Sequence, residues 1–235
     1  MNKYFIFVFL FIIQFSLYSQ NDISMEDFGN LNRYAEENKS IGTPADGEAR
    51  VVFMGNSITE FWGEIDSSFF KGKPYINRGI SGQTTPQMLL RFRSDVVDLK
   101  PAVVVILAGI NDIAENTGPI ALEDVFGNIV SMCQLASVNK IGVVLSSVLP
   151  ANDFPWHPEL HPAEKVIKLN NMIKTFCEEN NIVYLDYYSA MVNDKKGLDK
   201  ELAEDGVHPT LAGYKVMEPL VEQAIHKVLD VHDIN

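Results

Sequence analysis

The chain has 235 residues, of which 46% are hydrophobic and 21% are charged. This composition predicts one globular domain with a full core, and it excludes fibrous and intrinsically disordered chains. With 19 Lys and Arg residues against 31 Asp and Glu residues, the formal net charge is -12. The protein therefore lacks the overall positive field that attracts phosphate backbones, and we expect no nucleic acid partner.

Residues 1–19 differ in composition from the rest of the chain. Lys3 supplies a positive start, residues 4–13 are almost wholly aliphatic or aromatic, and Ser19 is a small residue at a possible cleavage point. Because the apolar run is short for a bilayer span of about 20 residues, we predict a signal peptide and a periplasmic or extracellular protein. The alternative is an uncleaved N-terminal anchor, in which case the protein would contact a membrane.

Residues 20–49 are expected to form an N-terminal helix and a loop ahead of the main domain at 50–235. Scattered apolar and acidic positions in residues 25–38 favour a short surface helix, and Pro44 lies in a glycine-containing loop at 42–47.

The main domain alternates short apolar runs with segments of helical periodicity. The apolar runs predict strands covered on both faces at 51–54, 75–77, 102–108, 141–148 and 182–185. The periodic segments predict helices at 85–99, 122–138, 163–180 and 211–229, the last kinked or broken at Pro219. Such alternation implies parallel pairing through right-handed crossovers, so we expect a three-layer α/β/α sandwich around a five-stranded parallel sheet.

Polar segments follow the first three predicted strands, and a fourth precedes the last predicted helix. These segments are 55–59, 78–85, 108–112 and 204–209. In open α/β sheets, ligands bind at the carboxyl ends of the strands. We therefore expect the four loops to converge on one edge of the sheet.

Three of these residues fit nucleophilic catalysis. The hydroxyl of Ser57 needs a base, and His208 is the candidate because Pro209 favours an extended backbone that lets the imidazole project into the cleft. Asp205 lies three residues before His208 and can accept the other ring N–H. The structural alternative is that Ser57 only caps a helix and His208 only begins one.

The same loops offer donors for a developing oxyanion. They are the backbone N–H groups of Ser57 and Gly82 and the side-chain amide of Asn111. Asn111 and Asp112 have an alternative role as helix caps, and we expect Asp112 to be structural rather than catalytic.

The four loops resemble the ordered blocks of the SGNH, or GDSL-like, hydrolase family. The blocks are Gly55-Asn56-Ser57-Ile58-Thr59, the Gly82 loop, Gly109-Ile110-Asn111-Asp112 and Asp205-Gly206-Val207-His208. The resemblance spans roughly residues 50–214 and implies a flavodoxin-like fold and ester hydrolysis without a cofactor or metal. It also implies an oxyanion hole of Ser57, Gly82 and Asn111, with Asp205 and His208 completing the catalytic triad.

Two residues depart from the pattern of this family. Asn56 stands where the family name has aspartate, a frequent variant that leaves the nucleophile untouched. Gln83 stands where many members have aspartate after the glycine. We expect the missing charge beside the oxyanion hole to bear on substrate preference.

Three further features have competing explanations. Trp156 lies in a loop after the fourth strand and is either a wall of the substrate pocket or a packing residue. His157 and His161 are four residues apart, but the prolines that follow them disfavour a shared helix face, so we expect no metal site. Cys133 and Cys177 fall in predicted helices, which favours buried free thiols over a disulfide.

The resemblance and the predicted export together favour a serine esterase that acts, through an acyl-enzyme, on short-chain esters such as acetylated carbohydrates. The expected partner is thus a small-molecule or carbohydrate acyl ester. One alternative is a lysophospholipase or thioesterase that takes longer acyl chains. Another is a catalytically silent carbohydrate-binding domain that has kept the fold.

Overall fold

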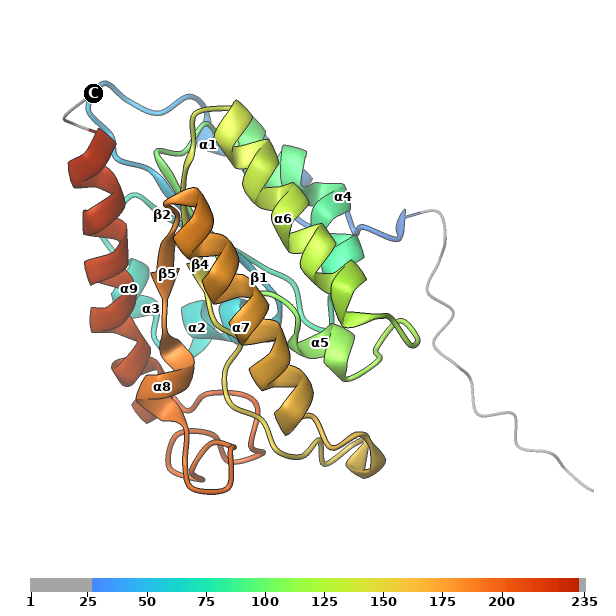
Figure 1. Cartoon of the computed structure of the whole chain (residues 1–235). Coiled ribbons are helices and arrows are strands. Elements are labelled where there is room, and N and C mark those ends of the chain that lie inside the picture. Colours follow the sequence, from blue (N-terminus) through green and yellow to red (C-terminus); the bar gives the residue numbers. More distant parts are fainter. Residues whose placement is uncertain (1–26, 233–235) are drawn as a thin grey trace, which may run out of the picture.

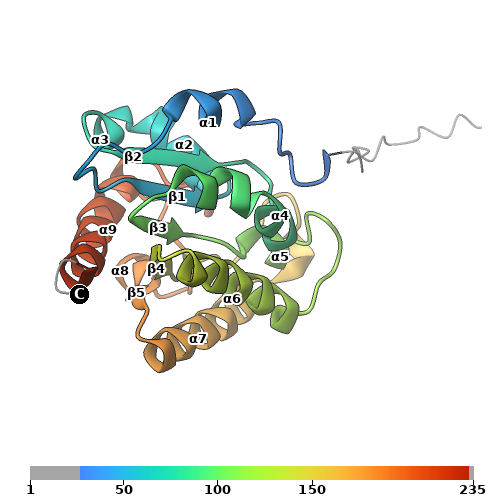
Figure 2. The ribbon, with the colours of Figure 1, turned by 90° about the horizontal axis from the view of Figure 1, so that it is seen from above.

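Five parallel strands form one sheet (Figure 1), and their order is β2-β1-β3-β4-β5 (Figure 2). The computed structural model describes residues 27–232. The strands are β1 (Val51–Gly55), β2 (Tyr75–Gly79), β3 (Val103–Ile106), β4 (Gly142–Ser146) and β5 (Val183–Leu185). Val51 is in register with Tyr75 on one side and with Val103 on the other. Every residue of β1, β3 and β4 is buried, which explains their continuous apolar sequences.

Helices cover both faces of the sheet. Helices α2 and α9 pack on one face, and α4, α6 and α7 form the layer on the other face (Figure 2). The helices are α1 (Ala35–Ile41), α2 (Ser57–Ile65), α3 (Ser67–Phe70), α4 (Thr85–Asp95), α5 (Ile110–Ile113), α6 (Leu122–Val138), α7 (Ala163–Asn180), α8 (Tyr187–Met191) and α9 (Leu211–His232). The predicted three-layer α/β/α architecture with a five-stranded parallel sheet is confirmed.

The N-terminal surface helix is shorter than predicted. It begins at Ala35, and residues 27–34 form turns instead. The carboxylate of Asp27 accepts hydrogen bonds from the backbone N–H groups of Leu31 (2.7 Å) and Asn32 (3.2 Å), which competes with helix formation. The predicted signal peptide or anchor at 1–19 lies outside the described residues. Within residues 27–232, no helix combines the length and the apolarity needed to cross a bilayer.

Of the kink or break predicted at Pro219, the break is wrong. Helix α9 runs without a break from Leu211 to His232, with Pro219 inside it. Proline removes one hydrogen bond of the helix, but buried contacts on both sides compensate. Met217 and Val221 are both fully buried against the sheet side of the helix. Tertiary packing thus overrides the local preference of proline.

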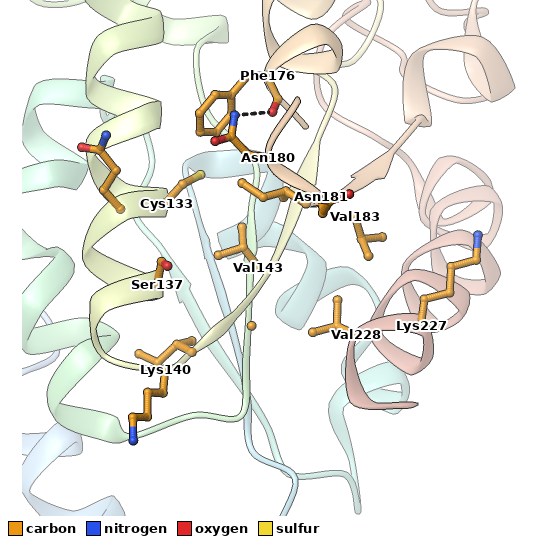
Figure 3. A pocket seen from close by; sticks show the side chains of 14 residues that line it. Cys133, Ser137, Lys140, Val143, Phe176, Asn180, Asn181, Val183, Lys227 and Val228 are labelled. Atoms are coloured by element: carbon orange, nitrogen blue, oxygen red, sulfur yellow. Dashed lines mark hydrogen bonds between the residues drawn. The ribbon is translucent and has the colours of Figure 1, made fainter. Parts of the chain in front are cut away.

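A hollow of about 380 Å³ opens at the amino edge of the sheet, between the C-terminal ends of α6, α7 and α9 (Figure 3). Val143 contributes to its apolar wall, and Cys133 and Ser137 line the α6 side. On the α7 side, Asn180 donates a hydrogen bond of 2.8 Å to the carbonyl of Phe176. The hollow therefore lies at the opposite edge of the sheet from the loops that follow the strands.

Both cysteines are buried free thiols, as predicted. Burial raises the pKa of Cys133 and of Cys177 to about 12. At neutral pH the two side chains therefore act as small apolar groups of the core.

Candidate active site

The carboxyl edge of the sheet gathers all four polar loops. Ser57 follows β1, Gly82 follows β2, Asn111 follows β3, and His208 precedes α9. Strand β1 lies between β2 and β3, so the chain leaves it in one direction for β2 and crosses back to the other side for β3. Such a switch point opens a crevice outside the strand ends, which is where α/β sheets bind ligands.

Ser57 is the first residue of α2, directly after the turn that leaves β1. Asn56 caps the helix, because its Oδ1 accepts a hydrogen bond of 3.0 Å from the backbone N–H of Ile58. The turn requires glycine at 55, since a side chain there would lie 1.9 Å from Oγ1 of Thr59. This tight strand-to-helix turn directs the hydroxyl of Ser57 toward His208, with 2.8 Å between Ser57 Oγ and His208 Nε2.

Asp205 holds the imidazole in place. Its Oδ2 lies 2.7 Å from His208 Nδ1, and its Oδ1 accepts backbone N–H bonds from Val207 (2.9 Å) and His208 (2.8 Å). Burial raises the pKa of Asp205, but the hydrogen bonds from His208 and Val207 outweigh that effect and hold the pKa below its ordinary value. In this geometry the carboxylate can accept the Nδ1–H of the imidazole, which leaves Nε2 available to accept the proton of Ser57.

Tyr214 fixes the two loops relative to each other, a role that no sequence motif indicates. Its buried hydroxyl donates a hydrogen bond of 2.8 Å to the carbonyl of Ile58, which ties the first turns of α9 to the first turn of α2. The Tyr214 ring also stacks on Trp62 of α2, with 5.2 Å between ring centroids. A packed contact between two helices thus supports the Ser57–His208 distance.

The three candidate oxyanion donors follow the ends of β1, β2 and β3. The backbone N–H of Ser57 has no partner among the residues 27–232, as expected for the first turn of a helix. Gly82 has a φ of 77°, a left-handed conformation that favours glycine. The side-chain amide of Asn111 donates a hydrogen bond of 3.0 Å to the carbonyl of Gln83 and retains a second N–H. These three groups are therefore available as the donors that the sequence predicts for an oxyanion.

The contacts of Asp112 hold the start of α4 in place. Its carboxylate accepts hydrogen bonds from the backbone N–H of Thr85 (3.0 Å) and from the Thr85 hydroxyl (2.6 Å). Burial raises the pKa of Asp112 above its ordinary value. The residue thereby secures the start of α4 to the loop after β3, and it caps α4 rather than the helix that follows it in sequence.

The Gln83 side chain faces the protein interior, and its expected effect on substrate preference stays a prediction. That side chain is buried, and its Nε2 donates a hydrogen bond of 2.9 Å to the carbonyl of Gly29. Its Oε1 accepts a hydrogen bond of 2.5 Å from the buried guanidinium of Arg91. Gln83 therefore points into the protein, where a neutral amide satisfies both a donor and an acceptor.

Aromatic rings flank His208 on two sides. The Trp156 ring centroid lies 6.1 Å from that of His208, and the Phe61 centroid lies 5.5 Å from it. Trp156 stacks on the buried Phe154 at 5.4 Å and keeps 48% of its surface exposed. The structure thus places Trp156 at the rim of the site, with one face supported by the core.

One of the two histidines in the same loop pairs with a carboxylate. His157 precedes the short turn Pro158–Leu160, and its Nδ1 lies 2.9 Å from a carboxylate oxygen of Glu159. Within residues 27–232, no group of three or more His, Cys, Asp or Glu side chains is arranged to hold a metal ion.

Known proteins resemble this chain in sequence and in structure. The family model described as GDSL-like Lipase/Acylhydrolase family matches residues 53–216. A GDSL-like lipase from Bacteroides thetaiotaomicron is 51% identical, with a TM-score of 0.83 over 85% of this chain and 98% of that chain. A provisionally assigned acylhydrolase from Bacteroides fragilis is 51% identical, with a TM-score of 0.85 over 86% of this chain and 99% of that chain.

A more distant relative is an acetylxylan esterase from Geobacillus stearothermophilus. It is 25% identical over 150 residues, which cover 60% of this chain and 67% of that protein. The family match takes in β1 from Phe53 onward, all four loops and the start of α9. The chain therefore belongs to the GDSL-like lipase/acylhydrolase family and is an ester hydrolase.

Proposed function

We propose that the protein is a serine esterase that removes short acyl groups, acetyl above all, from carbohydrates. Ser57 is the nucleophile, His208 is the general base, and Asp205 orients the imidazole. One observation carries this proposal: the contacts of 2.8 Å from Ser57 to His208 and 2.7 Å from His208 to Asp205 join the three side chains in series.

The reaction follows from this geometry in two steps. Ser57 Oγ attacks the ester carbonyl while His208 Nε2 takes the hydroxyl proton, and the resulting oxyanion accepts hydrogen bonds from the N–H groups beside it. The intermediate collapses when His208 returns the proton to the departing alcohol, which leaves the acyl group on Ser57. Water then gives its proton to His208 and attacks the acyl-enzyme, releasing the acid and restoring Ser57.

Two observations support a carbohydrate as the alcohol part of the substrate. Trp156 presents a half-exposed ring beside His208, and flat aromatic faces pack well against the apolar faces of sugar rings. The similarity to an acetylxylan esterase, although distant, points to the same class. We further propose that the enzyme acts outside the cytoplasm, on the strength of the signal-like residues 1–19.

The acyl preference is testable with p-nitrophenyl esters of increasing chain length. We expect kcat/KM to be highest for acetate and to fall as the chain grows. The side chains near the oxyanion donors are polar, among them Ser81, Asn111 and Asn116, so a longer chain gains little of the about 0.8 kcal/mol available per buried methylene. A maximum at medium or long chains would instead support a lysophospholipase or thioesterase.

The role of Trp156 is testable with the Trp156→Ala and Trp156→Phe variants. For acetylated xylooligosaccharides we expect Trp156→Ala to raise KM about 3- to 10-fold, the loss expected for one stacked ring. Trp156→Phe should retain most of the affinity, and p-nitrophenyl acetate should be hydrolysed at the wild-type rate by both variants. An equal loss on both substrates would mean that Trp156 supports the fold of the site rather than the sugar.

A further inference from the structure

The carboxylate of Glu60 connects α2 to the loop that carries Gly82. Glu60 lies one turn after Ser57 on α2. Its Oε2 accepts two hydrogen bonds from Ser81, one from the backbone N–H (2.7 Å) and one from the hydroxyl (2.5 Å). Its Oε1 accepts a third from Arg33 (2.9 Å). The Glu60 side chain is only 15% exposed, although the charge partner Arg33 is 49% exposed.

Ser81 directly precedes Gly82, so its position sets the direction of the Gly82 N–H. Anchoring the Ser81 N–H fixes the chain on one side of the peptide that contains this donor. On the other side, Asn116 donates a hydrogen bond of 3.2 Å to the carbonyl of Gly82, and Asn111 donates one of 3.0 Å to the carbonyl of Gln83. The loop is thus held at both ends of the Gly82 residue, which has a positive φ.

The same helix therefore serves both backbone donors of the oxyanion hole. Ser57 offers its own N–H from the first turn of α2, and Glu60 holds the loop of the second donor from the next turn. Because an α-helix is rigid over one turn, the distance between the two donors is set by side-chain contacts to one element. Misplacing one donor is costly, since removal of a single oxyanion donor typically slows catalysis about 100- to 1000-fold.

The ionised form of Glu60 is the one that fits these contacts, because all three groups facing it are donors. Burial raises the pKa of Glu60, but hydrogen bonds from Ser81 and Arg33 more than offset this and hold the pKa below its ordinary value. An amide at this position would keep one acceptor oxygen and turn its N–H₂ group toward either Ser81 or Arg33. Either orientation places a donor against a donor.

We propose that Glu60 is a positioning residue that holds the Ser81–Gly82 turn so that the Gly82 N–H is aimed at the carbonyl oxygen of the substrate. The role rests on the proposed function, because it assumes that the substrate carbonyl lies between the N–H groups of Ser57 and Gly82. Glu60 acts through the loop and does not touch the substrate.

The test is Glu60→Gln, with Glu64→Gln as the matched control on the exposed side of the same helix. With p-nitrophenyl acetate we expect Glu60→Gln to lower kcat about 10- to 100-fold and to change KM less than about twofold. The loss in kcat should be smaller than that for complete removal of one oxyanion donor, because the Gly82 N–H is misdirected rather than absent. Affinity for a boronic acid that mimics the tetrahedral intermediate should fall by a similar factor, whereas inhibition by the product acetate should not change. Glu64→Gln should match the wild type in every measurement.

Ser81→Ala is the second variant, because it removes one of the three hydrogen bonds to Glu60 without altering α2. We expect a kcat about 3- to 10-fold lower, again with an unchanged KM. Wild-type kcat and boronate affinity in both variants would overturn the positioning role, as would a loss that falls on KM alone. These results are distinct from failure of the proposed function, which would appear as esterase activity that survives Ser57→Ala.

Discussion

Replacing Ser57 with alanine should lower kcat for p-nitrophenyl acetate about 10⁴- to 10⁶-fold, with a melting temperature close to that of the wild type. The hydroxyl oxygen is the atom that would form the covalent intermediate, and within residues 27–232 the one hydrogen bond of Ser57 Oγ is to His208. His208→Ala should lose a comparable amount. The double variant should be little worse than either single variant, because the two groups act in one step.

Ser137→Ala is the matched control for this prediction. Ser137 lines the hollow at the amino edge of the sheet, which is the opposite edge from Ser57, and its replacement should leave kcat unchanged. A fluorophosphonate probe followed by peptide mapping should label Ser57 in the wild type and nothing in Ser57→Ala. Label on another serine would contradict the assignment of Ser57 as the nucleophile. A folded protein that resists the probe altogether would favour a silent binding domain.

The strands and long helices were predictable because their signals are local. The continuous apolar run of β1 reflects a strand that is buried along its whole length, and the helical spacing of α6 and α7 reflects helices that are buried on one face. The loops that gather at the carboxyl edge were also predictable, because parallel pairing alone places the ends of β1, β2 and β3 together. The order of the four motifs then indicated which residues of those loops are the candidates for catalysis.

The structural features that the sequence did not predict depend on contacts between segments that are distant along the chain. The carboxylate of Asp27 accepts backbone hydrogen bonds that shorten the N-terminal helix. The packing of α9 against the sheet keeps α9 continuous through Pro219. The Gln83 side chain points into the protein, where its Oε1 accepts a hydrogen bond from Arg91, eight residues later on α4. Glu60 and Tyr214 have no motif of their own, and only their contacts to Ser81 and Ile58 reveal what they hold.

Asp205→Asn should lower kcat about 10³- to 10⁴-fold while leaving the fold intact. Asparagine has nearly the same shape, so its Oδ1 can still accept the backbone N–H groups of Val207 and His208 that Asp205 holds at 2.9 and 2.8 Å. Its Nδ2 would replace the oxygen that lies 2.7 Å from His208 Nδ1, and a donor there forces the ring proton onto Nε2. His208 would then present a proton to Ser57 instead of accepting one.

Glu204→Gln is the control for the loss of charge in that variant, because Glu204 is the exposed neighbour of Asp205 and should tolerate the change with an unaltered kcat. NMR of the imidazole nitrogens should report the proton on Nδ1 in the wild type and on Nε2 in Asp205→Asn. Should the tautomer change without a fall in kcat, base catalysis by His208 would be refuted. Should kcat fall without a change of tautomer, Asp205 would act through its charge on the protonated imidazole rather than through orientation of the neutral ring.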